Sequence, residues 1–354
     1  MLSDKLGLLE DRVDAGRRYM RLRPEHGEAR WDLALQELAL GDITAGWEGY
    51  AFRWSHQYYR TWRYELPVPE WAGESLADKK ILAWREQGIG DEILFASCIP
   101  DLAKAASKVT LACTDRLVPL FTRSFPGVTV IDAKRITPPN VEHFDIDFHT
   151  SIGALPRWFR PTLESFPAAG GFLTADPARV RAWHDRLTAL PGLRVGISWR
   201  SGMMTADRAR SYATLEKWGP LLQVPGTTFV NLQYDDCSLA LATAEDRFGV
   251  HVHSFPDLDL RNDFEGAGAL MKNLDLIITI GNAVGELGGA LGVPTWRLSP
   301  TPIKEWTMLG TDRRPWFPSM RICQAPRTDD WEALVASLVD ELGALAGRAE
   351  RRAA

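Results

Sequence analysis

Residues 79–105 read KKILAWREQGIGDEILFASCIPDLAKA, and this stretch decides the fold. The apolar run from Ile81 to Trp84 predicts a buried strand, because it is short and ends at a turn with two glycines. After the turn the apolar residues recur at the spacing of a helix. Strand, glycine turn and helix in this order are the unit from which a parallel α/β sheet is built.

The same alternation continues along the chain and predicts two domains. After the stretch ESFPAAGGFLTADP (164–177), which is rich in Pro and Gly, it starts again. We expect two Rossmann-like α/β domains that face each other, with a ligand between the carboxyl ends of their sheets. The predicted strands lie in 81–84, 108–114, 127–133, 144–151, 193–202, 227–236, 250–255, 275–280 and 293–298.

The first 65 residues or so contain only helical patterns. Within them, ARWDLALQELALGDITAGWEGYAFRW (29–54) resembles one tetratricopeptide (TPR) unit, a pair of helices that pack closely through small residues. One such unit cannot bury its own apolar face, so we expect it to dock on the next domain rather than to end a shortened array. The predicted domains are a helical TPR-like module (1–70), a first Rossmann-like domain (71–190), a second Rossmann-like domain (191–327) and a C-terminal helix (328–354) that packs back on the first sheet domain.

Composition narrows the class of protein. The 354 residues carry a net charge of −5, which provides no general attraction to nucleic acid. Charges interrupt the start MLSDKLGLLEDRVD where a secretory signal needs an apolar run, and no run is long enough for a membrane span, so we expect a cytoplasmic protein. The 14 tryptophans are unusual, and six of them lie between Trp31 and Trp84, where we expect them to anchor one module to the next.

Cysteine and histidine spacing predicts no metal site. Four cysteines lie too far apart for a zinc motif or a dense disulfide framework, so we expect four reduced, mostly buried thiols. His251 and His253 alternate on one strand, but no third ligand is evident, and a structural role is favoured.

The first candidate turn is Glu86–Asp91. Its glycines let the chain pass sharply from strand to helix, so the helix N-terminus and a carboxylate face the predicted cleft. Asp91 is the better candidate for a general base and Glu86 is the second. The alternative is that the carboxylate only caps the helix.

Two further turns follow strands of the second domain. Arg200, Ser201 and Gly202 suit a phosphate, since Arg can hold two oxygens; the alternative is a solvated loop with a salt bridge to Asp207. Gln233 and Tyr234 end the next strand and could contact a base or sugar, unless they form a plain strand-end turn.

The third turn is the elbow IGNAVGELGG (280–289). Its small residues let a backbone lie close to a ligand at a helix N-terminus, although close helix–strand packing requires small residues too. It has neither a Walker lysine nor a dinucleotide fingerprint.

Taken in order, these motifs resemble one family over about residues 28–340. They are similar to the bacterial GT-B glycosyltransferases that follow tetratricopeptide repeats, relatives of heptosyltransferases and more distantly of protein O-GlcNAc transferases. SWRSG, NLQY and PWFP are most like flagellin glycosyltransferases, which are thought to use nonulosonic sugars. The segments that carry the resemblance are the W-x-x-Y-x-x-R-W run (47–54), WREQGIGDEILFAS, ISWRSG, FVNLQYDD, the elbow and RRPWFPSMRIC.

The resemblance implies a metal-independent sugar transfer from a nucleotide-sugar donor to a protein or glycan hydroxyl, with no further cofactor. The first sheet domain (71–190) would receive the acceptor, with Asp91 as the base, and the second (191–327) would hold the nucleotide sugar. The helical module would dock an acceptor protein. The alternatives are a GT-B scaffold without catalysis and an epimerase of the same fold. The implied nucleotide-sugar site comprises Gly90, Arg200, Ser201, Gly202, Gln233, Tyr234, Asn282, Ala283, Val284, Glu286 and Leu287.

The elbow departs from the family pattern. Heptosyltransferase-like relatives commonly read D-T-x-x-x-H-L-A-G-A there, whereas this chain has Gly281, Asn282 and Glu286 in place of Asp, Thr and His. A carboxylate cannot donate a hydrogen bond to phosphate as an imidazolium does. Either the donor differs from the usual one, or the site has lost catalysis.

Overall fold

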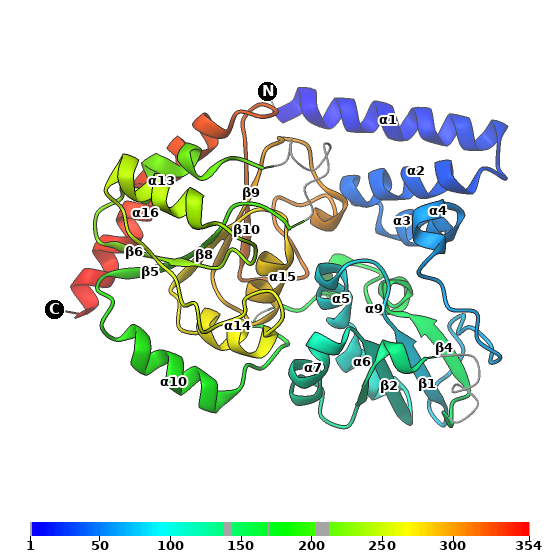
Figure 1. Ribbon diagram of the computed structural model, residues 1–354. Coiled ribbons are helices and arrows are strands. Elements are labelled where there is room, and N and C mark those ends of the chain that lie inside the picture. The colour runs from blue at the N-terminus through cyan, green and yellow to red at the C-terminus, as the bar shows by residue number, and fades with distance from the viewer. Residues whose placement is uncertain (1, 137–143, 169, 203–211, 354) are drawn as a thin grey trace. The chain divides into compact units, whose positions relative to one another are not determined.

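The computed structural model describes residues 2–136, 144–168, 170–202 and 212–353 (Figure 1). It divides into two compact units. Unit 1 comprises Met1–Ala169 with Ile303–Pro318, and unit 2 comprises Gly170–Pro302 with Ser319–Ala354.

Unit 1 begins with the predicted helices, and the helical pattern is confirmed. Gly41 ends α2 in the left-handed region (φ 95°), and Asp42 caps α3 through the N–H of Ala45, so the chain reverses within two residues. A side chain at Gly46 would overlap Leu38, which is why these helices can pack closely. The relation to tetratricopeptide units stays a prediction. The elements are α1 (Leu2–Leu22), α2 (Gly27–Leu40), α3 (Ile43–Tyr50), the 3-10 helix η1 (Ala51–Ser55) and α4 (Gln57–Arg60).

The first sheet has the order β3-β2-β1-β4, with every pair parallel, as predicted. One of its faces carries Leu82 and Trp84, which pack against Trp54 of η1 and against Tyr64, which follows α4. The helical segment, by which we mean α1 to α4 with η1, is therefore docked on this sheet. The elements are β1 (Lys80–Trp84), α5 (Ile89–Ala96), α6 (Ile99–Ala105), β2 (Lys108–Cys113), α7 (Val118–Ser124), β3 (Thr129–Asp132), β4 (Phe148–Ser151) and α9 (Pro156–Phe159).

Unit 2 contains the second parallel sheet, in the order β10-β9-β8-β5-β6-β7. Five of its strands were predicted; β10 was missed, because its short run MRICQ follows a stretch rich in Pro and Trp. The elements are α10 (Pro177–Leu187), β5 (Leu193–Ser198), η6 (Leu215–Trp218), α12 (Gly219–Leu222), β6 (Thr227–Asn231), α13 (Ser238–Phe248), β7 (Val252–His253), α14 (Phe264–Met271), β8 (Leu276–Thr279), α15 (Ala283–Ala290), β9 (Thr295–Ser299), β10 (Met320–Gln324) and α16 (Trp331–Ala353).

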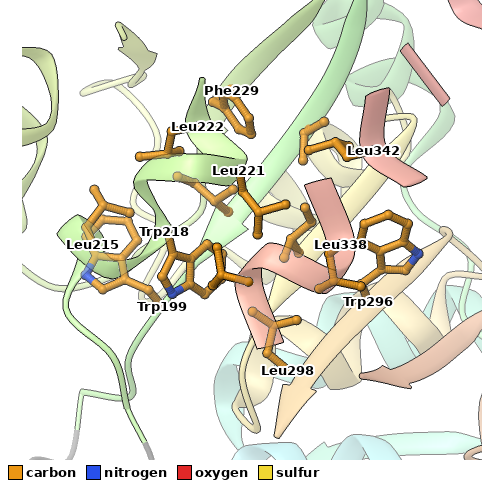
Figure 2. Packing of buried hydrophobic residues seen from close by; sticks show 14 of the residues in the cluster. Trp199, Leu215, Trp218, Leu221, Leu222, Phe229, Trp296, Leu298, Leu338 and Leu342 are labelled. Carbon is orange, nitrogen blue, oxygen red and sulfur yellow. The ribbon is translucent and has the colours of Figure 1, made fainter. Parts of the chain in front are cut away.

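Helix α16 belongs to unit 2, so the prediction that it packs back on the first sheet domain is wrong. Leu338 and Leu342 lie four residues apart on one face of the helix and pack in the same cluster as Trp218 and Leu221 (Figure 2). This cluster also contains Ile197 and Ile278 of the sheet, so η6, α12 and α16 bury one apolar surface together. Burial of that surface decides where α16 lies.

The boundary between the units also differs from the predicted one at residue 190. Helix α10 packs on α14 of unit 2, and Asn273 Nδ2 donates to the Val180 carbonyl over 2.9 Å. Residues 303–318 return to unit 1, where Trp306 lies in the η7 turn (Trp306–Met308). The boundary between the two units lies between Ala169 and Gly170, within the stretch 164–177 that is rich in Pro and Gly.

Tryptophans join the helical segment of unit 1 to this returning segment, which confirms their predicted anchoring role. The ring of Trp47 meets Trp306 and Trp316 edge-on, at centroid distances of 6.2 and 6.0 Å. Its Nε1 donates to the carbonyl of Arg160 over 3.0 Å, so the buried indole is hydrogen-bonded. One side chain thus joins three segments that are far apart in sequence.

All four cysteines are free and buried, as predicted. Burial raises the pKa of both Cys98 and Cys323 to about 12, so these thiols stay protonated at neutral pH. Among the described residues, no helix has the length and apolar content required to cross a membrane.

His149 supplies a buried acceptor in the first sheet. Its residue is 5% exposed, and Nδ1 accepts the Nε1–H of Trp84 over 3.1 Å. Burial lowers the pKa of His149 below its ordinary value of 6.5. The folded state therefore requires the neutral imidazole.

Replacing Trp47 with Ala should lower the free energy of unfolding by about 3–5 kcal/mol, because a large buried side chain and its hydrogen bond are lost. Urea unfolding of the full chain measures this. The matched control is Leu22→Ala, also in unit 1, whose side chain is 78% exposed; it should cost under about 0.5 kcal/mol. Equal losses would contradict the anchoring role of Trp47.

His149 should make stability fall with acidity. The unfolded chain binds a proton at His149 below about pH 6.5, whereas the folded chain resists it, so stability is lost as pH falls from 6.5 through the lowered folded pKa. His149→Asn keeps an acceptor for Trp84 but does not titrate. Between pH 7.5 and 5, wild type should lose more of its free energy of unfolding than His149→Asn does, as measured by urea unfolding.

Candidate functional site at the carboxyl edge of the second sheet

Each parallel sheet has one point at which the chain reverses its direction of strand addition. In unit 2 the chain runs from β5 outward through β6 and β7, then returns to add β8 on the other side of β5. In unit 1 the corresponding point lies between β1 and β4. Ligands of open α/β sheets bind outside the carboxyl ends of the strands at such a point.

Asn282 closes this point in unit 2. Its Nδ2 donates to Ser198 Oγ over 2.9 Å and to the Arg200 carbonyl over 3.2 Å, which links the end of β8 to the end of β5. Its Oδ1 accepts the N–H groups of Val284 and Gly285 and so caps α15. The predicted elbow is thus confirmed as a capped strand-to-helix turn at the switch point.

Gln233 provides the second link. Its Oε1 accepts Ser198 Oγ and the N–H of Arg200 over 3.1 and 3.2 Å, and its Nε2 donates to the Arg200 carbonyl over 3.1 Å. Gln233 is 2% exposed, so its side chain joins β6 to β5 from inside the unit. The structure therefore brings all three predicted motifs of the second domain together.

Arg200 lies at this edge in an ion pair that differs from the expected one. Its Nε is 2.9 Å from Asp235 Oδ2, and its Nη2 donates to the Asp236 carbonyl over 2.6 Å. The alternative pairing with Asp207 falls in residues 203–211, outside the described part of the chain. A guanidinium has five N–H donors, so these two bonds leave it capable of holding an anion as well.

Tyr234 engages the two small residues after Arg200. Its hydroxyl accepts the N–H of Gly202 over 2.9 Å and donates to Ser201 Oγ over 3.3 Å. The loop is thereby held close to the end of β6. A ligand that uses the Gly202 N–H would have to displace the tyrosine.

The side chains of the elbow point in different directions. Val284 and Leu287 are 6% and 1% exposed, so their side chains pack inside unit 2, and their place in a nucleotide-sugar site stays a prediction. Ala283 is half-buried in the first turn of α15, and Glu286 is 7% exposed. The backbone at the start of α15 is the part that a ligand can approach.

Arg297 was missed by the sequence analysis, although it lies beside the elbow. Arg297 lies opposite Thr279 in the register of β8 and β9. A Cβ atom at Gly281 would overlap the guanidinium of Arg297. The family's Asp cannot occupy position 281 here without moving Arg297. The sequence signal was weak, because an Arg in a predicted strand is normally exposed.

In unit 1, Asp91 lies in the first turn of α5. Its Oδ2 accepts the N–H of Gly88 over 3.1 Å, which is the helix cap that the alternative described. Asp91 is half-buried, as is Gly90 before it. A carboxylate has about four acceptor sites, so the bond from Gly88 does not by itself prevent Asp91 from accepting a proton.

Glu86 is fully buried at the switch point of the first sheet. Arg53 Nη2 is 2.9 Å from its Oε2, and Arg53 Nε donates to both carboxylate oxygens over 3.1 Å. Arg53 Nη2 also donates to Ser151 Oγ, at the end of β4, over 2.7 Å. A carboxylate that is 0% exposed and held this way cannot meet an acceptor, so Glu86 does not suit the predicted role of a base, and that role stays a prediction for Asp91.

No metal centre is evident in the described ranges: no three His, Cys, Asp or Glu residues gather as ligands. The rings of His251 and His253 lie 4.8 Å apart, and His251 Nδ1 is 3.2 Å from Glu245 Oε1. This pair is at β7, far in sequence from the elbow.

Comparison with known proteins gives the fold. No family model matches the chain. The glycosyl transferase family 9 structure from Veillonella parvula superposes with a TM-score of 0.51 at 11% identity, covering 78% of this chain and 97% of that one. The E. coli ADP-heptose LPS heptosyltransferase II gives 0.53 at 13% identity, covering 77% and 99%. The chain has the GT-B fold of glycosyltransferases.

A curated relative matches this GT-B chain in sequence. Protein FlbA of Caulobacter vibrioides (strain ATCC 19089 / CIP 103742 / CB 15) is 37% identical over 318 residues. The match covers 86% of this chain and 53% of FlbA, so the chain spans about half the length of that relative.

Asn282 should stabilise unit 2 in two ways: its oxygen caps α15, and its NH2 group bonds to the end of β5. Asn282→Ala removes both and should lower the free energy of unfolding by about 2–3 kcal/mol, whereas Asn282→Ser keeps a capping oxygen and should cost about 1 kcal/mol less. Urea unfolding followed by tryptophan fluorescence compares them. Identical losses would show that the cap at α15 contributes nothing.

Proposed function

We propose that the chain is a glycosyltransferase that moves a sugar from a nucleotide-sugar donor to a protein or glycan hydroxyl without a metal ion. The observation that carries the proposal is the polar closure of the second sheet's switch point by Asn282 and Gln233, in a chain with the GT-B fold. Such buried, fully bonded amides hold the strand ends rigid at the edge where ligands bind.

The donor phosphates bind at the start of α15 and beside Arg200. The helix N-terminus supplies the positive end of its dipole, while the N–H groups of Val284 and Gly285 bond to Asn282 Oδ1. Arg200 is held in place by Asp235, so it is already oriented when the donor arrives. These fixed groups stabilise the charge that develops on the leaving phosphate, which is the work a metal would otherwise do.

The transfer is a direct displacement. The acceptor hydroxyl oxygen forms a bond to the anomeric carbon while the bond from that carbon to the phosphate oxygen breaks. The hydroxyl proton passes to the Asp91 carboxylate, and the nucleotide leaves with the electron pair of the broken bond. Asp91 suits this role because it lies half-buried at a helix N-terminus.

The acceptor is a protein, and the helical segment docks it. Helix α1 supports this, since it exposes Leu8, Tyr19 and Leu22 to 63%, 40% and 78% on a helix that packs against α2. Flagellin Ser or Thr residues are the acceptor that the family resemblance implies. The same surface would serve a scaffold without catalysis, which is the competing function.

Isothermal titration with ADP-, UDP-, GDP- and CMP-sugars tests the donor site. ADP-sugars come first, because a structure of E. coli heptosyltransferase WaaC contains ADP. One of them should bind the wild type, and Arg200→Ala should weaken that binding at least tenfold. Absence of binding to every nucleotide sugar would leave the scaffold function instead, and turnover of donor without acceptor would indicate an epimerase.

Asp91→Asn tests the base. The Asn oxygen still accepts the Gly88 N–H, so the cap is retained while the proton acceptor is lost. Transfer should fall about 100- to 10,000-fold, with donor affinity changed less than about twofold. Loss of donor binding in Asp91→Asn would show that this carboxylate binds the donor rather than the acceptor proton.

A further inference from the structure

Gln87 holds a backbone conformation that side chains rarely adopt. Its φ is 61°, in the left-handed region, and it lies between the end of β1 and the start of α5. A residue with a Cβ loses about 1–2 kcal/mol there relative to the right-handed region. Such a conformation persists only where the surroundings impose it.

Two residues of the helical segment impose it. Gln87 Nε2 donates to the hydroxyl of Tyr50 over 2.9 Å and to Glu86 Oε1 over 3.2 Å. Glu86 is held in turn by Arg53, whose Nη1 also donates to the Tyr50 carbonyl over 3.2 Å. Burial and the neighbouring Glu86 carboxylate raise the pKa of Tyr50 well above its ordinary value, so the phenol stays neutral.

Arg53 and Glu86 fill the switch point of the first sheet with side chains of the protein itself. The Arg53 guanidinium bridges Glu86, after β1, and Ser151, at the end of β4. A side chain at Gly153 would overlap Glu86 Oε1, so that position has to remain small. The place where a ligand would bind in the first sheet is therefore occupied by the protein's own arginine.

The candidate base depends on the same turn. Gly88 follows Gln87 directly, begins α5 as its N-cap, and donates its N–H to Asp91 Oδ2. If Gln87 rotated to the right-handed region, the Gly88 N–H would change direction and release that carboxylate.

We infer that Tyr50 and Arg53 are positioning residues that hold the turn before α5 and thereby orient Asp91. This inference rests on the proposed function of Asp91, and it makes the helical segment part of the catalytic site as well as a docking element. A change in that segment that disturbs Tyr50 or Arg53 will alter transfer without touching the donor.

Tyr50→Phe in the full chain tests the link by removing one hydroxyl. Hydrogen exchange followed by mass spectrometry should show the amides of 86–91 exchanging at least tenfold faster, with the unfolding midpoint near that of wild type. Tyr58→Phe is the matched control, because that ring is 50% exposed in the same segment, and it should leave exchange of 86–91 unchanged. Wild-type exchange in Tyr50→Phe overturns the inference.

Kinetics separates this inference from the proposed function. With the donor that binds, Tyr50→Phe should lower kcat about tenfold and leave donor affinity unchanged. If wild type transfers no sugar, the proposed function fails; if wild type transfers and Tyr50→Phe transfers equally fast, only the positioning role fails.

Arg53 is tested by a double substitution, because Arg53→Met alone leaves a buried, unpaired carboxylate and can prevent folding. Arg53→Met with Glu86→Met replaces the pair by apolar side chains of similar length, which commonly preserves folding. The folded double variant should bind donor and transfer at least tenfold more slowly. A folded double variant with the wild-type transfer rate overturns the role of Arg53.

Discussion

A parallel sheet that is covered on both faces leaves only its ends for polar chemistry, and this constraint governs both units. Strand β8 is buried along its whole length and β1 is buried from Ile81 to Trp84, so the next residues able to carry a charge are those that follow the carboxyl end. Each turn there leads into a helix N-terminus. The residues that cap a helix, form an ion pair or bind a ligand must therefore all come from these short turns.

The two units place different side chains at the switch point. In unit 1 the switch point is filled by Arg53, which is paired with Glu86 and shielded from solvent. In unit 2 it is closed by the neutral amides of Asn282 and Gln233, which bond to the strand ends and leave the start of α15 near the surface of the edge. This contrast supports assigning the donor to the second unit.

Aromatic packing explains why the helical segment behaves as part of unit 1. Trp47 meets the returning segment through Trp306 and Trp316, while Trp54 lies over Trp84 of the sheet at 5.8 Å. Large rigid rings bury much area at a low cost in side-chain entropy. The segment is thus held firmly enough to orient the turn before α5.

The sequence by itself determined the alternation of strands and helices and the glycine turns, because these depend on residues that are neighbours in the chain. Only the tertiary structure decided that Glu86 pairs with Arg53, that Arg200 pairs with Asp235, that Arg297 lies beside Gly281 and that α16 packs in unit 2. These outcomes depend on which segments meet, and many distant partners were chemically suitable for each residue. Burial and exclusion of water from each meeting point selected among them.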